Sequence, residues 1–366
     1  MKNRNTLISI LLVSILLCGG NHLFAEQAES KDDGVIWHDA SQLTLEGKGW
    51  SDTESPYDRL PVKARDIVRE EIWNLSKHSA GVRIRFTSDA KFIRVRWTLI
   101  KEALDLPHMP ATGVSGIDLY AREESGEWRF VANGRPTGQS NEAEFKLIPN
   151  AEHALYLPLY NGVQQVEMGA YKTRTFQKSE PSADERRKLI VFYGTSITQG
   201  ACASRPGMAS TAIVGRKLDV PIINLGFSGN GRMDPEMAEL LGELDPAVFV
   251  LDCLWNMTPE MIPERVEPFV AILREHRPET PIVLVEDSNF LDKPTKDGDI
   301  LRDIYEKLKV QGDENLHLLP NTGMLGSDTE GTVDGVHLND LGMMRQALSF
   351  EAFLKPILEA GGSDAK

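Results

Sequence analysis

Residues 189–200 read LIVFYGTSITQG, and this stretch decides the fold of the second half of the chain. Its first five residues are all apolar, which is typical of a strand buried on both faces in a parallel sheet. Gly194 then allows a sharp turn, so Ser196 is expected at the carboxyl edge of that sheet. Ligands of open α/β sheets bind at this edge. Ser196 is therefore a candidate nucleophile, and a helix N-cap is the alternative role for it.

The alternation of strands and helices continues to the end of the chain. Further apolar runs occupy residues 222–225, 248–251 and 282–285. Helical patterns lie between and after them, at residues 208–218, 235–244, 259–276, 300–310 and 339–358. This alternation predicts a doubly wound α/β domain over residues 189–360.

A different pattern fills residues 34–177, where apolar and polar residues alternate with a period of two. Strands are expected at residues 82–86, 92–97, 116–121, 128–131, 154–159 and 163–168, with turns at Ser88-Asp89, Ser125-Gly126, Asn133-Gly134 and Asn161-Gly162. No helix is expected among them. Short strands separated in this way predict an antiparallel β-sandwich domain. The polar stretch at residues 178–188 is interpreted as a linker.

Residues 1–25 have the layout of a secretory signal peptide, with two basic residues, an apolar run and small residues. The apolar run over residues 7–17 is too short for a bilayer span, which needs roughly 20 residues. Cleavage after Ala25 would give an exported protein, periplasmic or extracellular, without a stable membrane span. Cys18 raises the alternative of a lipid anchor, but Leu17 is bulky where such sites need a small residue.

Composition excludes some classes of partner. The chain has 366 residues, of which 41% are hydrophobic and 26% charged, as in a folded globular protein. Its formal net charge of −14 argues against nucleic acid and against anionic membrane surfaces as partners. The charge does not identify a substrate or an oligomeric state.

Two more loops are expected at the same edge of the sheet. Residues 224–231 read NLGFSGNG, and their glycines suit a loop whose amides approach another group closely, or simply a flexible turn. Residues 251–257 read LDCLWNM, in which Asn256 offers a side-chain amide. These loops follow different strands but converge on one rim.

The last loop, residues 333–339, reads VDGVHLN. Asp334 and His337 are three residues apart on a turn, so the carboxylate can hold one ring nitrogen while the other accepts a proton. A metal site is the alternative, but it would need more ligands than these two, and no paired-histidine motif occurs elsewhere. A nucleophile, a base, an acid and N–H donors on one rim are what acyl transfer requires.

The order of these motifs resembles that of the SGNH, or GDSL-like, hydrolases. The resemblance implies a flavodoxin-like three-layer α/β/α domain without a cofactor or metal. It implies Ser196 as nucleophile and first oxyanion donor, Gly229 as second donor through its amide, and Asn256 as third donor through its side chain. His337 would be the general base and Asp334 its orienting partner.

The resemblance extends to the first half of the chain. Residues 116–120 read GIDLY, which is similar to the signature of a small β-domain that precedes certain bacterial SGNH esterases. It implies a jelly-roll-like sandwich. Two departures stand out, since Gly-Thr-Ser-Ile replaces the usual Gly-Asp-Ser-Leu, and only Asn256 matches the usual Gly-x-Asn-Asp block.

Five other residues near the rim are singled out. Arg205, Arg232 and Trp255 are candidate substrate contacts, and an ion-paired or solvated side chain is the alternative for the arginines. The strand order 2-1-3 of the SGNH hydrolases makes the strands preceding Cys202 and Cys253 neighbours. A disulfide between these cysteines is therefore predicted, with two small residues filling the sheet edge as the alternative.

The function expected from these features is that of an exported serine esterase. Short acyl esters, acetyl groups on carbohydrates above all, are the expected substrates, because an exported enzyme with an added β-domain suits glycans and no lid-like apolar segment is evident. An acyltransferase using the same acyl-serine is the first alternative. A non-catalytic carbohydrate-binding protein is the second.

Overall fold

A computed structural model describes residues 34–179 and 189–361. The described residues from 35 onward belong to one compact unit. The predicted signal peptide, with Cys18, lies outside the described residues, and so does most of the predicted linker. No helix in the described part of the chain is long and apolar enough to cross a membrane.

A five-stranded parallel sheet organises the second half of the chain, in the order β12-β11-β13-β14-β15. The strands are β11 (Ile190–Gly194), β12 (Ile222–Gly226), β13 (Val248–Asp252), β14 (Ile282–Val285) and β15 (Leu316–Leu319). Every residue of β11, β13 and β14 is buried, as the apolar runs predicted. β15 was not predicted, because its short sequence Leu-His-Leu-Leu carries no clear pattern.

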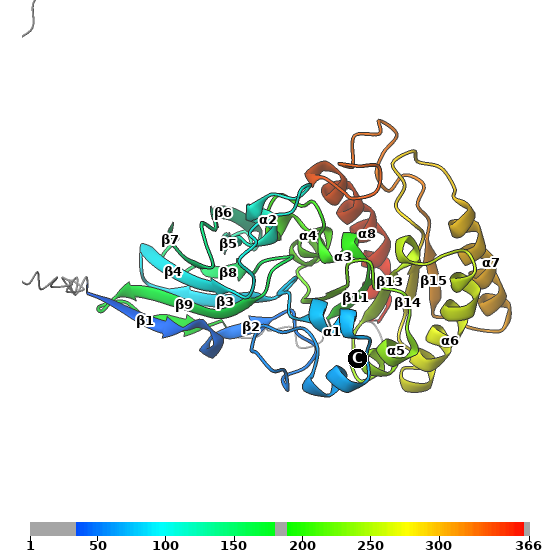
Figure 1. Cartoon of the computed structure of the whole chain (residues 1–366), viewed down its shortest axis with the longest axis horizontal. Helices are drawn as coiled ribbons and strands as arrows, with labels where there is room; N and C mark the ends of the chain where they lie inside the picture. The colour runs from blue at the N-terminus through cyan, green and yellow to red at the C-terminus, as the bar shows by residue number, and fades with distance from the viewer. Residues whose placement is uncertain (1–33, 180–188, 362–366) are drawn as a thin grey trace, which may run out of the picture. The chain divides into compact units, whose positions relative to one another are not determined.

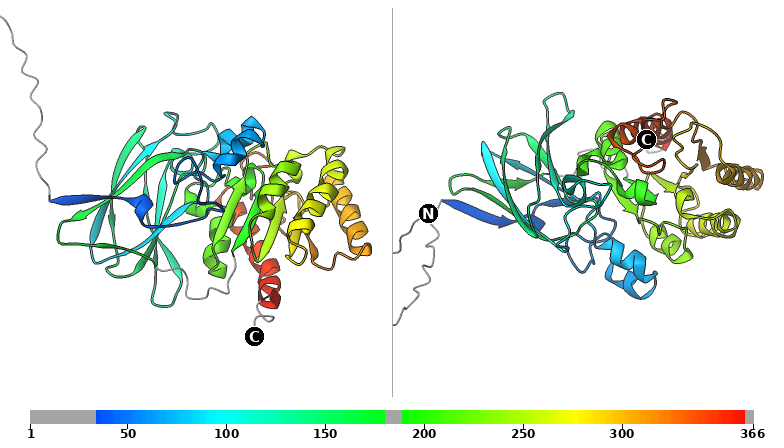
Figure 2. Two further views of the ribbon diagram at one scale, coloured as in Figure 1. Left: turned by 90° about the horizontal axis from the view of Figure 1, so that it is seen from below. Right: turned by 45° about the horizontal axis from the view of Figure 1, so that its top comes forward.

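Helices contribute to a separate core on each face of this sheet (Figures 1 and 2). One core holds residues of α5 (Pro235–Gly242), α6 (Met261–His276) and α7 (Lys296–Val310). The other holds residues of α4 (Ser210–Leu218) and α8 (Asp340–Gly361). Neighbouring residues of β11 divide between them, since Tyr193 stacks on Phe269 of α6 and Phe192 meets Phe350 of α8. The α/β class predicted from the sequence is confirmed.

The first half of the chain forms two antiparallel sheets. The first has the order β1-β9-β4-β7, with β1 (Val35–Asp39), β9 (Val163–Tyr171), β4 (Phe92–Leu99) and β7 (Ser140–Lys146). The second has the order β10-β3-β8-β5-β6, with β2 (Thr44–Glu46) beside β3. Its strands are β10 (Phe176–Lys178), β3 (Arg83–Ser88), β8 (Glu152–Tyr156), β5 (Ile117–Arg122) and β6 (Trp128–Gly134). Side chains of both sheets, such as Trp97 and Leu155, share one apolar core.

Two details of this half differ from the prediction. The helices α1 (Glu70–Ser76) and α2 (Ala111–Val114) occur where none was expected. Asn133 and Gly134, predicted to form a turn, are paired residues of β6. The Asn133 side chain donates hydrogen bonds to Asp118 Oδ1 at 2.8 Å and to the Ile117 carbonyl at 3.1 Å, which hold it in the sheet.

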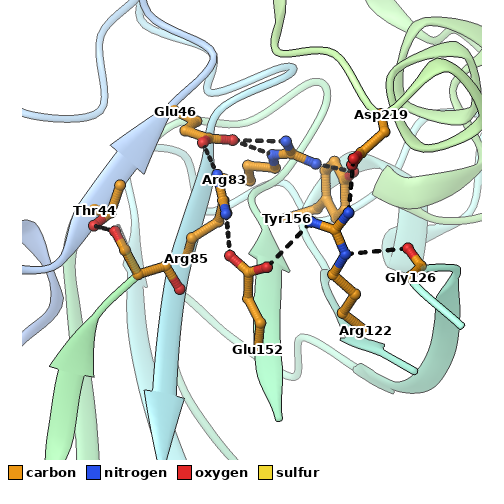
Figure 3. A network of polar contacts seen from close by, with 10 residues as sticks. Thr44, Glu46, Arg83, Arg85, Arg122, Gly126, Glu152, Tyr156 and Asp219 are labelled. Atoms are coloured by element: carbon orange, nitrogen blue, oxygen red, sulfur yellow. Dashed lines mark hydrogen bonds and ion pairs between the residues drawn. The ribbon is translucent and has the colours of Figure 1, made fainter. Parts of the chain in front are cut away.

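Charged residues on the second sheet form a network that reaches the α/β half (Figure 3). Arg85 pairs with both Glu46 and Glu152. Arg122 pairs with Glu152 and also, at 2.6 Å, with Asp219, the residue that follows α4. The side chains of this sheet that face α4 therefore carry paired charges as well as apolar contacts.

Candidate active site

Ser196 lies at the first position of α3 (Ser196–Gln199), immediately beyond β11. The N-cap of α3 is Thr195, whose side chain accepts a hydrogen bond from the Ile197 amide at 3.2 Å. The Ser196 hydroxyl is thus not used as the cap, and the alternative role considered for it is wrong. Gly194 is required before the turn, because a β-carbon there would lie 2.2 Å from Thr198 Oγ1.

The loop before α8 brings an imidazole and a carboxylate to this hydroxyl. Ser196 Oγ lies 3.0 Å from His337 Nε2, and His337 Nδ1 lies 2.7 Å from Asp334 Oδ2. An ionised carboxylate only accepts hydrogen bonds, so Nδ1 carries the proton and Nε2 is left to accept from Ser196. The arrangement can move a proton from the serine oxygen to the imidazole.

The carboxylate is held in its charged form by the turn itself. Burial opposes ionisation, but hydrogen bonds from the His337 ring and from the amides of His337 and Val336 outweigh it and lower the pKa of Asp334 to about 2. Both amide bonds end on Oδ1, at 2.7 and 3.0 Å. The other oxygen is left for the ring, so Asp334 fixes the orientation and tautomer of His337.

The register of the sheet places the other predicted loops at the same edge. Gly194 at the end of β11 pairs with Gly226 of β12 and with Asp252 of β13. Gly229 follows three residues after Gly226, in the left-handed conformation with φ of 70°. Among the described residues no hydrogen bond uses the Gly229 amide, and no heavy atom lies within 4 Å of a β-carbon built on it. The Gly229 N–H group can therefore donate a hydrogen bond to a ligand oxygen.

Asn256 ends the short 3-10 turn η4 (Leu254–Asn256) that follows β13. Its Oδ1 is buried without a hydrogen-bond partner, and no bond to its Nδ2 is formed within the described part of the chain. Such a side-chain amide is expensive to bury unused. Its polar atoms are therefore available to a ligand at the edge of the sheet.

Arg59, which sequence reasoning missed, binds backbone carbonyls at the start of the glycine-containing loop after β12. This guanidinium is 1% exposed and donates to the carbonyls of Asn224 at 3.1 Å and Gly226 at 2.7 Å. It also donates to the carbonyls of His78 and Leu75. Burial lowers the pKa of Arg59 to about 9. The charge is therefore solvated mainly by backbone dipoles, and it fixes the start of the loop.

A second arginine from the first half holds the outer side of the same loop. Arg69 Nη1 donates to Asn230 Oδ1 at 2.6 Å, and Nη2 donates to the Asn230 carbonyl at 3.0 Å. Arg69 also pairs with Asp234, which in turn binds Arg265. No local pattern around Arg69 signals this role. It is visible only in the folded chain.

The candidate substrate contacts have different surroundings. Arg205 Nη1 donates to Asp118 Oδ2 at 2.8 Å and to the Tyr120 hydroxyl at 2.7 Å, so it connects the α/β half to the GIDLY strand. This is the ion-paired alternative given for Arg205, and the predicted substrate contact stays a prediction. Arg232 Nε donates to the Gly229 carbonyl at 2.9 Å and supports that loop. Trp255 Nε1 donates to the Ser288 carbonyl, and the ring is half-buried beside the site.

The predicted disulfide is not formed. Cys202 and Cys253 are both buried free thiols. They belong to the two different cores on opposite faces of the parallel sheet, Cys253 with α5 to α7 and Cys202 with α4 and α8. The strands that precede the two cysteines, β11 and β13, are neighbours as predicted. The two sulfurs nevertheless lie in cores on opposite faces of the sheet. Both cysteines are instead small buried side chains without a covalent partner, as in the alternative given for them above.

Residues of the β half also contact the nucleophile turn directly. The Tyr160 hydroxyl donates to the Ser196 carbonyl at 3.0 Å. Gln199 is fully buried and donates to the Leu159 carbonyl, while its Oε1 accepts from the Ser228 amide at 3.0 Å. The ring of His108 lies 5.4 Å from that of His337, centroid to centroid. Tyr160 and His108 did not stand out in the sequence, because they are separated from the residues they contact by 36 and 229 positions.

The described residues contain no cluster of three or more side chains able to hold a metal ion. Asp252, at the end of β13, accepts a hydrogen bond from Thr198 Oγ1 at 2.9 Å, and burial raises its pKa to about 6. This contact joins α3 to the neighbouring strand. It supports the serine turn rather than offering a ligand.

Comparison with known proteins finds relatives of both halves of the chain. A family model of GDSL-like lipases and acylhydrolases matches residues 187–355, and a model of the N-terminus of SGNH-hydrolase-type esterases matches residues 35–176. The crystal structure of a GDSL-like lipase from Bacteroides ovatus is 32% identical, covering 89% of this chain and 98% of that one, with a TM-score of 0.82. The chain belongs to the GDSL-like lipase/acylhydrolase family. A search of curated proteins gave no match.

Two more distant structures share the fold of this GDSL-like acylhydrolase. A salicylyl-acyltransferase from a tetracycline biosynthetic pathway, SsfX3, is 21% identical over 89% of this chain and 98% of that one, with a TM-score of 0.72. A family two carbohydrate esterase from Cellvibrio japonicus is 12% identical over the same shares of the two chains, with a TM-score of 0.58. At these identities the likeness concerns the fold alone.

Proposed function

We propose that this GDSL-like acylhydrolase is a serine esterase that removes short acyl groups, acetyl above all, from carbohydrate esters. The observation that carries the proposal is the chain of contacts from Ser196 Oγ to the His337 ring at 3.0 Å and from that ring to the Asp334 carboxylate at 2.7 Å. A hydroxyl aligned with a base that is itself oriented by a carboxylate is the arrangement of an activated nucleophile.

The proposed reaction has two halves. Ser196 Oγ attacks the ester carbonyl carbon as its proton passes to His337 Nε2, and the bond from that carbon to the alcohol oxygen then breaks. His337 returns the proton to the departing alcohol. Water next attacks the acyl-serine, gives a proton to His337 and releases the carboxylic acid, after which Ser196 regains its proton. Asp334 stays ionised throughout and stabilises the imidazolium.

The developing negative charge on the carbonyl oxygen needs preorganised donors. We assign this role to the amides of Ser196 and Gly229 and to the Asn256 side chain. The unused Gly229 amide and the half-buried, unpaired Asn256 amide support the assignment. Asn256→Ala should lower kcat by roughly 10²–10³-fold while leaving measurable activity. Turnover equal to that of the unchanged protein would remove Asn256 from the site.

The substrate class is proposed from the organisation of the whole chain. The predicted export and the added β half suit glycan esters, and the carbohydrate esterase of C. japonicus shows that this fold can carry such an activity. We further propose the flavodoxin-like, three-layer α/β/α class for residues 189–360 and a jelly-roll-like class for residues 34–177. The separate cores on the two sheet faces support the first.

Hydrolysis of 4-nitrophenyl acetate, butyrate and octanoate by the purified protein tests the proposal. Acetate should be preferred, and Ser196→Ala should abolish turnover, whereas Ser125→Ala in an exposed hairpin should not. Labelling of Ser196 by a fluorophosphonate, located by peptide mass spectrometry, checks the nucleophile independently. Equal inactivity of all three proteins and no labelling would refute the esterase.

A transferase is the second candidate, because the salicylyl-acyltransferase has the same fold. Both reactions pass through the same acyl-serine and differ only in the acceptor. Product analysis with an added alcohol separates them. An acyl transfer to the alcohol that exceeds hydrolysis at millimolar acceptor would favour the transferase.

Export is proposed from residues 1–25 alone. N-terminal sequencing of the protein recovered from the periplasm or the medium should begin at Glu26. A retained N-terminus, or a lipid label at Cys18, would contradict cleavage after Ala25.

A further inference from the structure

The loop before α2 carries a histidine, His108, whose ring lies beside that of His337. Residues 101–110 leave β4 and approach the turn that holds His337 from the β half of the chain. The rings of His108 and His337 lie 5.4 Å apart at an angle of 44°. His108 is exposed, and in the described structure no hydrogen bond uses its ring nitrogens. An imidazole beside the proposed base thus has both polar atoms available.

The backbone around His108 is fixed rather than loose. Leu106 and Met109 exchange two backbone hydrogen bonds of 3.0 Å, which close a tight turn over Pro107 and His108. Pro107 occupies the turn position that favours proline, and Met109 is 2% exposed in the core shared with α4 and α8. The ring is therefore presented from an anchored turn.

Contacts on either side hold this turn in register with His337. Thr112 Oγ1 in α2 donates to the Ser204 carbonyl at 2.6 Å. Ser204 in turn donates to Asp340 at the start of α8, through its amide at 2.8 Å and its hydroxyl at 2.6 Å. Since α8 begins three residues after His337, the spacing of the two imidazoles is set by a continuous chain of contacts.

The side of the site on which His108 lies follows from the proposed reaction, on which this inference rests. The carbonyl oxygen of the ester points to the amides of Ser196 and Gly229, on the loops after β11 and β12. The departing alcohol must lie beside His337 Nε2, which gives it a proton. A side chain in ring contact with His337 therefore borders the alcohol and not the acyl chain.

We propose that His108 is a specificity-determining residue that binds the alcohol portion of the ester through hydrogen bonds to hydroxyl groups of a polyhydroxylated alcohol such as a sugar. The β half of the chain then selects the leaving group, while the α/β half performs the chemistry. An imidazole can donate to one hydroxyl and accept from another. Loss of one such bond is worth roughly a 3- to 10-fold change in affinity.

The test compares two alcohols with the same acetyl group. His108→Ala should lower kcat/KM for an acetylated methyl glucoside by roughly 3- to 10-fold and leave that for ethyl acetate within about twofold. His108→Gln should restore part of the loss, because its amide also donates and accepts. His38→Ala removes another exposed β-half histidine, one that contacts Phe176, and should change neither rate. Equal losses on both acetates, or a shifted preference for acyl length among 4-nitrophenyl esters, would overturn the inference.

Binding measured without turnover separates this inference from the proposed function. Calorimetry of Ser196→Ala with the acetylated methyl glucoside should give a Kd that rises by the same factor when His108→Ala is added. A Kd that does not change overturns the role of His108, whatever the reaction. A Kd that depends on His108 in a protein whose unchanged form hydrolyses no ester retains the inference and refutes the esterase.

Discussion

The Asp334 carboxylate divides its two oxygens between different tasks. Oδ1 accepts the two amides of its own turn, and Oδ2 faces the His337 ring. Asp334→Asn preserves the shape but can offer an N–H₂ group to Nδ1, which favours the wrong tautomer. We expect kcat to fall by about 10⁴-fold with little change in KM. Steady-state kinetics on 4-nitrophenyl acetate measure this, and retention of more than a tenth of the activity would contradict it.

Asp328→Asn is the matched control for that substitution. Asp328 lies in the same segment before α8 and also carries a lowered pKa of about 2, caused first by its hydrogen bond with Arg345. It has no contact with His337 among the described residues. Its loss should affect stability slightly and kcat hardly at all.

Residues of the site could be predicted from the sequence where they lie in a recognisable motif, and not where their partners are distant in the sequence. Ser196, Asp334 and His337 were found because each follows a recognisable strand or precedes a helix, and the structure brings their side chains together. The ion pair of Arg205 could not be predicted, because its partner, Asp118, is 87 positions away. His108 and Tyr160 could not be found, since the proximity that defines their roles exists only after the two halves pack.

Among the elements, the loop after β12 depends on arginines from outside the sheet. Arg69→Met keeps an unbranched apolar stem but removes the hydrogen bonds to Asn230 and Asp234. The Gly229 amide should then lose its fixed position, and kcat should fall by roughly 10- to 100-fold. Arg65→Met, which removes an exposed pair with Glu54, is the control. Equal kcat for both variants would show that the loop needs no such support.

The strand β8 carries a histidine whose burial predicts a pH effect. His153 is fully buried, stacks on Phe86, and burial lowers its pKa from 6.5 to about 4. The unfolded chain binds the proton more readily than the folded one. Above pH 6.5 the ring is neutral in both states, so its titration does not change the free energy of unfolding. As the pH drops from 6.5 towards 4, the unfolded chain takes up the proton and the free energy of unfolding falls. His153→Phe should unfold with a smaller loss of urea midpoint between pH 7.5 and 4.5.

The exposed His38 serves as the control for this titration. Other groups also titrate in that range, so the difference between each variant and the unchanged protein is the quantity to compare. His38→Phe should keep the full pH dependence. If His153→Phe keeps it as well, the ring is not the source.

Elements buried on both sides were the most predictable parts of the fold. The apolar runs of β11, β13 and β14, and the run of β12 that Asn224 interrupts, identified them directly. In contrast, α1 was missed because a seven-residue helix lies within a half that otherwise alternates with period two. Asn133-Gly134 has the composition of a turn but stays in β6 through its bonds to β5. Local composition therefore failed where long-range pairing decided the structure.

On the scale of the whole molecule, the GIDLY strand connects the two halves. Asp118 is fully buried and accepts from Arg205 at 2.8 Å and from the Gly207 amide at 2.8 Å. Asp118→Asn removes a buried charge opposite an arginine and should lower the free energy of unfolding by about 3 kcal/mol. Urea denaturation followed by fluorescence measures this. Asp303→Asn, on the exposed face of α7, should have no such effect.

The same experiment reports on cooperativity. Since buried contacts join both halves, we expect one unfolding transition for the unchanged protein and for the variant. A second transition appearing only in Asp118→Asn would show that this residue couples the halves. An unchanged midpoint would show that it does not.

The Arg59 contacts bear on attempts to engineer a smaller catalyst. A gene shortened to begin at residue 189 would encode all five parallel strands and still leave the carbonyls of Asn224 and Gly226 without their donor. It would also expose Gln199, which is now sealed from water. A smaller version of this protein should therefore lose residues of the sheet that contains β1 and β7, and should keep residues 51–82, which include Arg59 and two of the carbonyls that bind it.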